Sequence, residues 1–266
     1  MRNDTPTRAP VLFAVTALVS FFMIAPMLLS VMAGLVVNYG AGLKSGLTLR
    51  WLGEVWEVYG GTVGWSLALA VACVALTVVL GVPCAYAIAS SRSRAARAFE
   101  ELLTLPVAVP GLATALALIL AYWQIGAFRQ SFAFILVGHV VFTLPFMVRT
   151  VASAFQRHDL VALEEAARTL GASFRQRFMG ILVPAVFPAI VAGGLMVFTL
   201  SVGEFNLTWM LHTPLTRTLP VGLADSYASM RLEVGSAYTL VFFIVILPVL
   251  WGLQSLAHLL QQRHGT

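Results

Sequence analysis

Six long apolar runs constrain the fold of this chain more than any other feature. A helix that crosses the hydrocarbon core of a bilayer needs roughly 20 apolar residues. Only 10% of the 266 residues are charged and 59% are hydrophobic, whereas soluble domains carry about 25% charged residues. We therefore predict an all-α membrane protein, a single transmembrane domain over 1–266 with about six transmembrane helices and no room for a soluble catalytic domain. The predicted spans cover about residues 11–37, 62–90, 102–124, 131–149, 183–205 and 237–258.

The basic residues predict how the chain is oriented. Cytoplasmic segments of membrane proteins carry an excess of Lys and Arg. With the N-terminus inside, eleven of the sixteen basic residues fall in inner segments. We therefore predict an N-in, C-in topology. The inner residues are Arg2, Arg8, Arg92, Arg94, Arg97, Arg149, Arg157, Arg168, Arg175, Arg177 and Arg263, and the outer ones are Lys44, Arg50, Arg129, Arg217 and Arg231.

A polar, basic segment at about 152–182 separates the fourth and fifth apolar runs and reads as a cytoplasmic helical hairpin. Its first helix is expected over 159–170, with Asp159 capping the N-terminus. Gly171 supplies the left-handed position that ends a helix at little cost. A second basic helix is expected over 172–182. Apolar residues at helical spacing predict one stripe along the first helix: Leu160, Leu163, Ala167 and Leu170.

The spacing inside this hairpin is more specific than its amphipathic character, which alone would also suit a loop lying on the membrane surface. The segment reads Glu165-Ala166-Ala167, three residues, Gly171, nine residues, then Ile181-Leu182-Val183-Pro184. It resembles the EAA loop of binding-protein-dependent ABC transporter permeases, in which Leu stands at the position of Val183. Six spans with the signature before the penultimate one are also similar to the type I importer permease fold, over nearly the whole chain.

The resemblance implies that the chain is the multi-pass transmembrane subunit of an ATP-driven importer in the bacterial cytoplasmic (inner) membrane. It implies a cytoplasmic ABC ATPase dimer, a second permease subunit (identical or homologous) and an extracytoplasmic solute-binding protein as partners. ATP and Mg would be bound by the ATPase, so this chain would need no cofactor and would not be an enzyme. The solute is expected to be small and polar or charged, of the phosphonate, polyamine, iron, thiamine or molybdate type. The residues expected to couple to the ATPase are Glu164, Glu165, Ala166, Ala167, Arg168, Gly171 and Pro184.

Polar residues within apolar spans are costly to bury in lipid, and they are therefore candidates for the solute pathway. We identify four: His139 in the fourth span, and Ser201, Glu204 and Asn206 at the outer end of the fifth. Two alternatives remain open. Glu204 is also placed where an interfacial acid would meet water, and His139 is also suited to a hydrogen bond with a neighbouring helix.

Other functional classes find less support in the sequence. A self-sufficient secondary transporter or channel would need ionisable residues near the bilayer midplane, and only His139 meets that requirement clearly. An intramembrane enzyme would need a nucleophile and a base, or two acids, at depth. There is no metal-ligand spacing of His, Cys and Asp, and no phosphate-binding Walker lysine. Membrane lipid is an expected contact, and nucleic acid is not.

Overall fold

The computed structural model describes residues 8–91 and 93–264, and these are almost entirely helical. Arg2 and Arg92, which contribute to the predicted orientation, lie outside the described residues. The chain divides into two compact units, one built from residues 1–60 and 223–245 and the other from 61–222 and 246–266.

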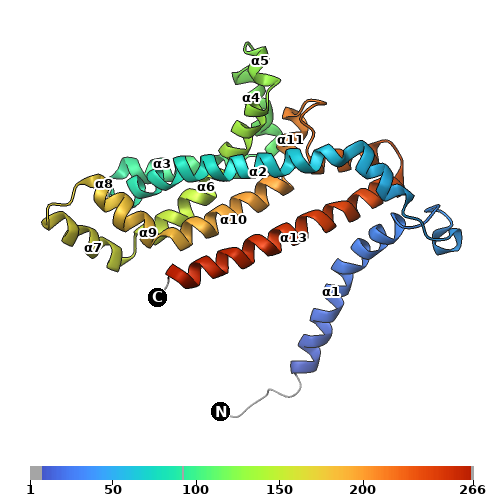
Figure 1. The fold of residues 1–266 in the computed structure, drawn as a ribbon, viewed down its shortest axis with the longest axis horizontal. Coiled ribbons are helices and arrows are strands. Elements are labelled where there is room, and N and C mark those ends of the chain that lie inside the picture. The colour runs from blue at the N-terminus through green and yellow to red at the C-terminus, as the bar shows by residue number, and fades with distance from the viewer. Residues whose placement is uncertain (1–7, 92, 265–266) are drawn as a thin grey trace. The chain divides into compact units, whose positions relative to one another are not determined.

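The first unit holds the N-terminal helix and the segments that follow it (Figure 1). The indole N–H of Trp51 donates to the carbonyl of Val36 at 2.9 Å, and the backbone N–H of Tyr39 donates to Glu233 Oε1 at 2.9 Å. Arg231 forms an ion pair with Glu54. These polar contacts join segments far apart in sequence. The elements are α1 (Arg8–Ala33), the 3₁₀-helix η1 (Gly42–Ser45), the start of α2 (Arg50–Ser90), the end of α12 (Leu219–Ala228) and the start of α13 (Leu232–His264).

Gly34, directly after α1, lies against the backbone of α13. A Cβ at this position would overlap the backbone of Ser236 and Ala237, and backbone cannot move aside as a flexible side chain can. We expect Gly34→Ala to destabilise the protein by about 1–3 kcal/mol, because the two segments must separate. Thermal unfolding in detergent measures this loss. Gly53→Ala is the matched control, since its Cβ meets nothing within 4 Å; equal melting temperatures for the two variants would contradict the close approach.

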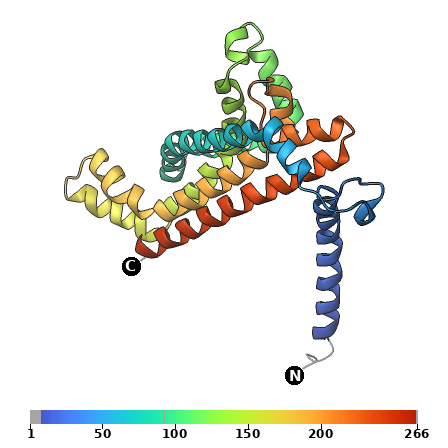
Figure 2. The same cartoon turned by 45° about the vertical axis from the view of Figure 1, so that its right-hand side comes forward.

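The second unit is a bundle in which α6 and α10 run side by side, as Figures 1 and 2 show. The second part of α2 and the end of α13 also belong to it. Its remaining elements are α3 (Arg94–Ala108), α4 (Gly111–Ala121), α5 (Gly126–Arg129), α6 (Phe132–Phe155), α7 (His158–Thr169), α8 (Phe174–Arg177), the π-helix η2 (Phe178–Leu182), α9 (Val183–Ala185), α10 (Phe187–Gly203) and α11 (Asn206–Leu211).

Met147 of α6 lies at the centre of this bundle and is fully buried. A Cβ on Gly81 of α2 would lie 2.8 Å from Met147 Cγ, and a Cβ on Gly193 of α10 would lie 2.9 Å from its Sδ. Glycines on two neighbouring helices therefore leave the space that the long Met147 side chain fills. Small residues at contacts of this kind are typical of membrane helix packing, because close approach replaces the missing hydrophobic driving force.

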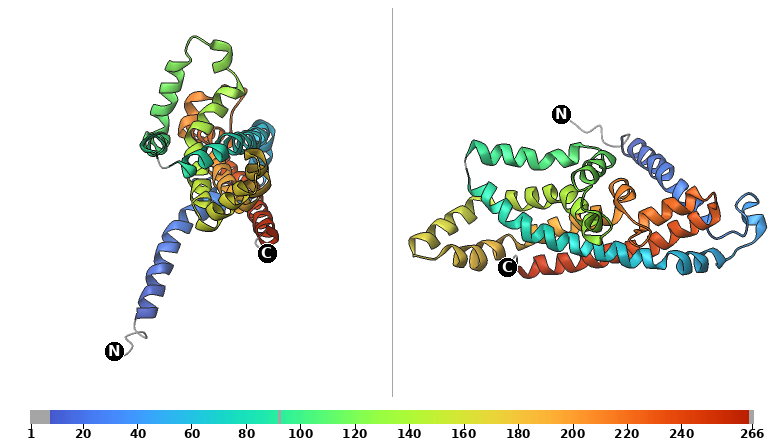
Figure 3. Two further views of the ribbon diagram at one scale, coloured as in Figure 1. Left: turned by 90° about the vertical axis from the view of Figure 1, so that its left-hand side faces the viewer. Right: turned by 90° about the horizontal axis from the view of Figure 1, so that it is seen from above.

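Four helices of the described chain are long and apolar enough to cross a membrane: α1, α2, α6 and α13. Two bent helix pairs raise the number to six if each crosses as one span, which agrees with the predicted count. The predicted third span at 102–124 is wrong as a single helix, because α3 and α4 meet at 107°; Figure 3 shows this turn in both views. Pro110 explains it, since a residue before proline is pushed into the extended conformation that Val109 adopts.

The predicted fifth span at 183–205 is also interrupted. The segment Phe174–Ala185 and helix α10 meet at 66° around Val186. Pro188 stands in the first turn of α10, where its missing N–H breaks no helical bond but cannot continue the preceding helix. The π-helical turn η2 and the short helix α9 precede the bend. The chain therefore changes direction between the cytoplasmic hairpin of the predicted topology and the long part of α10.

Candidate functional site

The hairpin expected from the sequence is present as α7 and α8. Gly171 has φ +81°, and the hydrogen bonds Gly171 N–H to Arg168 O and Ala172 N–H to Ala167 O, both at 3.1 Å, form a Schellman motif. Helix α8 then begins with a capping box between Ser173 and Gln176. The left-handed turn predicted for Gly171 is confirmed. Two adjacent capping devices thus make the connection between the helices short and well defined.

The start of α7 differs from the prediction. Helix α7 begins at His158, so Asp159 lies in its first turn and does not cap it. The carboxylate of Asp159 instead accepts a hydrogen bond from Arg157 at 2.8 Å within an exposed ion pair. An acid in the first turn still suits the positive end of the helix dipole.

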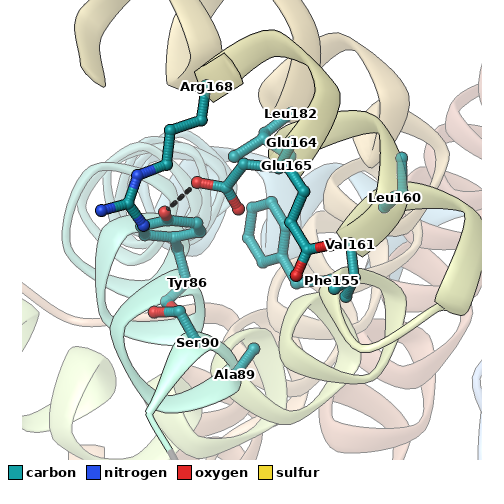
Figure 4. A pocket seen from close by; sticks show the side chains of 10 residues that line it. All are labelled: Tyr86, Ala89, Ser90, Phe155, Leu160, Val161, Glu164, Glu165, Arg168 and Leu182. Carbon is teal, nitrogen blue, oxygen red and sulfur yellow. Dashed lines mark hydrogen bonds between the residues drawn. The ribbon is translucent and has the colours of Figure 1, made fainter. Parts of the chain in front are cut away.

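An aromatic cluster fastens the hairpin to the bundle. Tyr86, near the end of α2, donates its hydroxyl to Glu164 Oε1 of α7 at 2.6 Å (Figure 4). Its ring packs against Phe155 of α6 with centroids 5.5 Å apart, and against Phe174 and Phe178 at 5.8 and 5.3 Å. Residues from α2, α6, α7, α8 and η2 therefore meet around one tyrosine.

A cavity of about 520 Å³ lies beside this cluster, between the hairpin and the ends of α2 and α6. Figure 4 shows Glu164 pointing to the Tyr86 hydroxyl, while Glu165 extends toward another part of the cavity. The charged groups come from α7, whereas α2, α6 and η2 supply most of the apolar wall. The lining residues are Tyr86, Ala89, Ser90, Phe155, Leu160, Val161, Glu164, Glu165, Arg168 and Leu182.

Helix α7 has an inward and an outward face, and the predicted apolar stripe reaches from one to the other. Leu160 and Ala167 are 6% and 9% exposed, and Glu164 is turned inward with them. Leu163 and Leu170 are 47% and 88% exposed, so the bundle covers only part of the stripe. Spacings of four and three residues from Leu160 lead to Glu164 and then Ala167, because these positions share one side of a helix. The inward face therefore contains a carboxylate.

The seven residues expected to couple to an ATPase fall into two groups, one that faces the bundle and one that is exposed. Glu164 and Ala167 face the bundle, whereas the remaining five are exposed. Pro184 lies in α9, beyond the hairpin and at the bend before α10. Of the seven residues expected to couple to an ATPase, those exposed on the hairpin itself are Glu165, Ala166, Arg168 and Gly171.

The intramembrane candidates form a buried hydrogen-bond network. His139 of α6 is fully buried; its Nδ1 lies 2.8 Å from Ser201 Oγ of α10 and its Nε2 lies 2.8 Å from Thr208 Oγ1 of α11. The Thr208 hydroxyl donates to Glu204 Oε2 at 2.9 Å. At the other end, Thr143 Oγ1 donates to the His139 carbonyl at 2.7 Å. The network thus joins α6 and α10 to the short helix α11.

The chemistry of the donors assigns the tautomer of His139. A carboxylate only accepts, so Thr208 uses its single proton toward Glu204. Nε2–H of His139 must then donate to Thr208 Oγ1, and Nδ1 must accept from the Ser201 hydroxyl. Both ring nitrogens are occupied in a neutral imidazole. His139 therefore fits the interhelical hydrogen-bonding alternative better than a free proton-carrying group.

Glu204 is half-buried, and its carboxylate caps α11. Oε1 accepts from the Leu207 N–H at 3.0 Å and Oε2 accepts from the Thr208 N–H at 2.9 Å. Asn206, the first residue of α11, is exposed, and within the described part of the chain it makes no hydrogen bond to this network. Three of the four pathway candidates are thus brought together, and they act as packing partners in this conformation.

Comparison with known proteins decides the family. The profile of the family described as "Binding-protein-dependent transport system inner membrane component" matches residues 77–263. The chain belongs to this family. It is 27% identical over 242 residues to the putrescine transport system permease protein PotI of Escherichia coli K12, which covers 88% of this chain and 85% of PotI. It is 28% identical to the molybdenum transport system permease protein ModB of Mycobacterium tuberculosis H37Rv, over 70% of this chain and 74% of ModB.

A solved structure supports the fold of this permease. The crystal structure of a bacterial alginate ABC transporter in complex with an alginate pentasaccharide-bound periplasmic protein contains a chain with a TM-score of 0.71. The two chains are 16% identical, and the match covers 97% of the permease and 96% of that chain. The predicted family and the predicted ABC importer permease fold are therefore confirmed, and the permease is a multi-pass membrane protein of a transport system.

Sequence reasoning missed Tyr86 and Thr208 of the permease. Tyrosine is enriched where a membrane span meets the interface, so the place of Tyr86 near the end of α2 was a signal of a general kind. Thr208 stands four residues after Glu204, a spacing at which helical side chains meet. Neither signal identifies the partner helix.

Among residues 8–91 and 93–264, no three His, Cys, Asp or Glu side chains come together as a metal site.

Proposed function

We propose that this permease is the transmembrane subunit of an ATP-driven importer and that the α7–α8 hairpin couples it to a cytoplasmic ATPase dimer. The outward face of the hairpin is the observation that carries the proposal. Leu163, Leu170 and Phe174 are exposed apolar side chains on a polar, basic hairpin, and the carboxylate of Glu165 is exposed on another side of α7. Such a surface suits a soluble partner with an apolar groove and a basic side chain, because apolar anchors and a charged rim are typical of interfaces.

The hairpin has the geometry that force transmission requires. Helix α7 has 12 residues, so it is about 18 Å long and can lie along a groove. Its far end is closed by the Schellman turn at Gly171, and its inward face is tied to α2 and α6 through Tyr86 and Phe155. Binding and hydrolysis of ATP, with Mg, would take place on the partner, and this chain would carry no cofactor of its own.

The remaining partners follow from the family. Its description names a binding-protein-dependent system of the inner membrane, and the similar alginate transporter was solved with a periplasmic protein bound. We propose an extracytoplasmic solute-binding protein, a second permease subunit (identical or homologous) that completes the pathway, and a location in the bacterial cytoplasmic membrane with both termini inside.

The solute is proposed to be small and polar or charged. PotI is named for putrescine, a cation, and ModB for molybdenum, so the similar permeases do not agree on one charge. The carboxylate of Glu204 is occupied by the N–H groups of α11, which argues against a fixed cation site at this residue in the present conformation. We propose that the binding protein carries most of the selectivity.

Isolation of the tagged permease from its native membranes in mild detergent tests this proposal. An ATPase subunit should co-purify with the wild-type chain and be lost with Glu165→Arg, while membrane insertion is unchanged. Glu57→Arg is the matched charge reversal at an exposed acid outside the hairpin and should retain the ATPase. A wild-type chain that purifies without an ATPase and still moves solute in liposomes would favour a self-sufficient secondary transporter or channel.

A further inference from the structure

Tyr86 lies between the hairpin and the bundle and contacts both. It belongs to α2, 78 residues before its hydrogen-bond partner Glu164, so the contact joins two elements that are distant in sequence. The O···O distance of 2.6 Å is that of a charge-assisted bond from a hydroxyl to a carboxylate. Bonds of this class are short, directional and stronger than neutral ones. The contact therefore holds one orientation of α7 relative to the end of α2.

The ring of Tyr86 cannot supply that orientation by packing alone. Its contacts with Phe155 and Phe178 are edge-to-face, at interplanar angles of 76° and 66°. Phe155 belongs to α6 and Phe178 to η2, so these ring contacts do not reach α7. In addition, the cavity of about 520 Å³ lies along the same side of the hairpin, so a close-packed wall is absent there. The hydroxyl, and not the ring, is the part of Tyr86 that defines how α7 is turned.

We propose that Tyr86 is a positioning residue that passes movement of the coupling hairpin to α2 through its hydrogen bond with Glu164. This inference rests on the proposed function and deepens it. It divides the two adjacent acids of the hairpin between two tasks: Glu164 is bonded to Tyr86 of α2, whereas the exposed Glu165, which extends toward another part of the cavity, is assigned to the ATPase. When the hairpin rotates, the end of α2 must follow, because the bond cannot stretch without breaking.

The variant Tyr86→Phe tests the passage of movement to α2 separately from the binding of the ATPase to the hairpin. It removes the hydroxyl and keeps the ring that packs among the phenylalanines. The permease, its ATPase and its binding protein would be reconstituted in proteoliposomes. We expect about a tenfold fall in solute imported per ATP hydrolysed, the size expected for loss of a hydrogen bond to a charged group. The amount of co-purified ATPase should stay within about twofold of wild type. Tyr39→Phe, an exposed tyrosine outside the hairpin, is the matched control.

Changes at Glu164 test whether the two residues act through one bond. Glu164→Gln keeps an oxygen that accepts from Tyr86 and should retain more coupling than Glu164→Leu, which has none. The double variant Tyr86→Phe with Glu164→Leu should be no worse than Glu164→Leu alone, because the shared bond is already lost. Additive losses would overturn the proposal, and so would normal coupling in Tyr86→Phe.

The two proposals fail in different ways. If the wild-type chain binds no ATPase, the proposed function is wrong and the Tyr86 variants have no bearing on it. If the wild type and Tyr86→Phe both bind ATPase and both import with the same ratio of solute to ATP, the coupling role of the hairpin stands and the role of Tyr86 is wrong. Loss of the ATPase from Tyr86→Phe would assign Tyr86 to the shape of the docking surface and would also overturn the positioning role.

Discussion

Gly171→Pro is expected to abolish solute uptake and to remove the ATPase from the purified permease. Proline fixes φ near −65°, whereas position 171 has φ +81°, and proline also lacks the N–H that donates to Arg168 O. The loss of the Schellman turn should cost the hairpin about 3 kcal/mol or more, which is enough to unfold a two-helix element of this size locally. Co-purification of the ATPase and uptake into proteoliposomes measure the effect.

Gly171→Asn is the matched control for this expectation. Asparagine tolerates the left-handed conformation better than other residues with a side chain and keeps the N–H. Nothing lies within 4 Å of a Cβ at this position, so the added side chain meets no obstacle. This variant should keep most of the uptake. If Gly171→Pro also transports normally, the turn is not needed and the hairpin cannot be the coupling element in the form proposed.

His139→Leu is expected to lower the stability of the transmembrane helices clearly. It leaves the hydroxyls of Ser201 and Thr208 buried without their common partner, and it removes two hydrogen bonds of 2.8 Å. Unpaired buried hydroxyls and lost hydrogen bonds together should cost about 2–3 kcal/mol. We expect the melting temperature in detergent to fall by about 4–10 °C. The short helix α11 should become the first region to lose protection in hydrogen exchange.

Two comparisons make this second expectation specific. His139→Gln keeps both a donor and an acceptor, so it should lose less stability than His139→Leu. His212→Leu is the matched change outside the network, because His212 is half-buried and its ring makes a hydrogen bond to the carbonyl of Trp209 at 2.9 Å. A melting temperature of His139→Leu equal to that of His212→Leu would show that the network does not hold α11 in place.

Local signals predicted the α7–α8 hairpin well. Gly171 requires only its own backbone angle, and the amphipathic spacing of α7 is a property of neighbouring residues, so both could be inferred from the order of the residues alone. The exposure of Leu163 and Leu170 could not be predicted, because spacing says which residues share a side of a helix but not which part of that side is covered. The bundle covers the side that carries Leu160, Glu164 and Ala167.

In the transmembrane helices too, some features could be predicted from the sequence and others depended on packing. Apolar length predicted about six spans, since length and composition decide whether a segment can cross a bilayer. The 107° bend at Val109 and Pro110 was encoded locally by proline, but its size depends on the packing of α4 against α11 and α6. The predicted N-in, C-in orientation rests on the distribution of Lys and Arg and stays a prediction.

By itself, the sequence determined the class of this protein, its membrane character and the spacing of the motif in its α7–α8 hairpin, because each depends on residues that lie close together along the chain. Only the tertiary structure decided that Tyr86 meets Glu164 and that His139 joins Ser201 to Thr208, over 78, 62 and 69 residues respectively. Contacts over such distances form when packed helices bring polar groups together. A buried polar group must find a partner, but which partner it finds is set by how the helices pack.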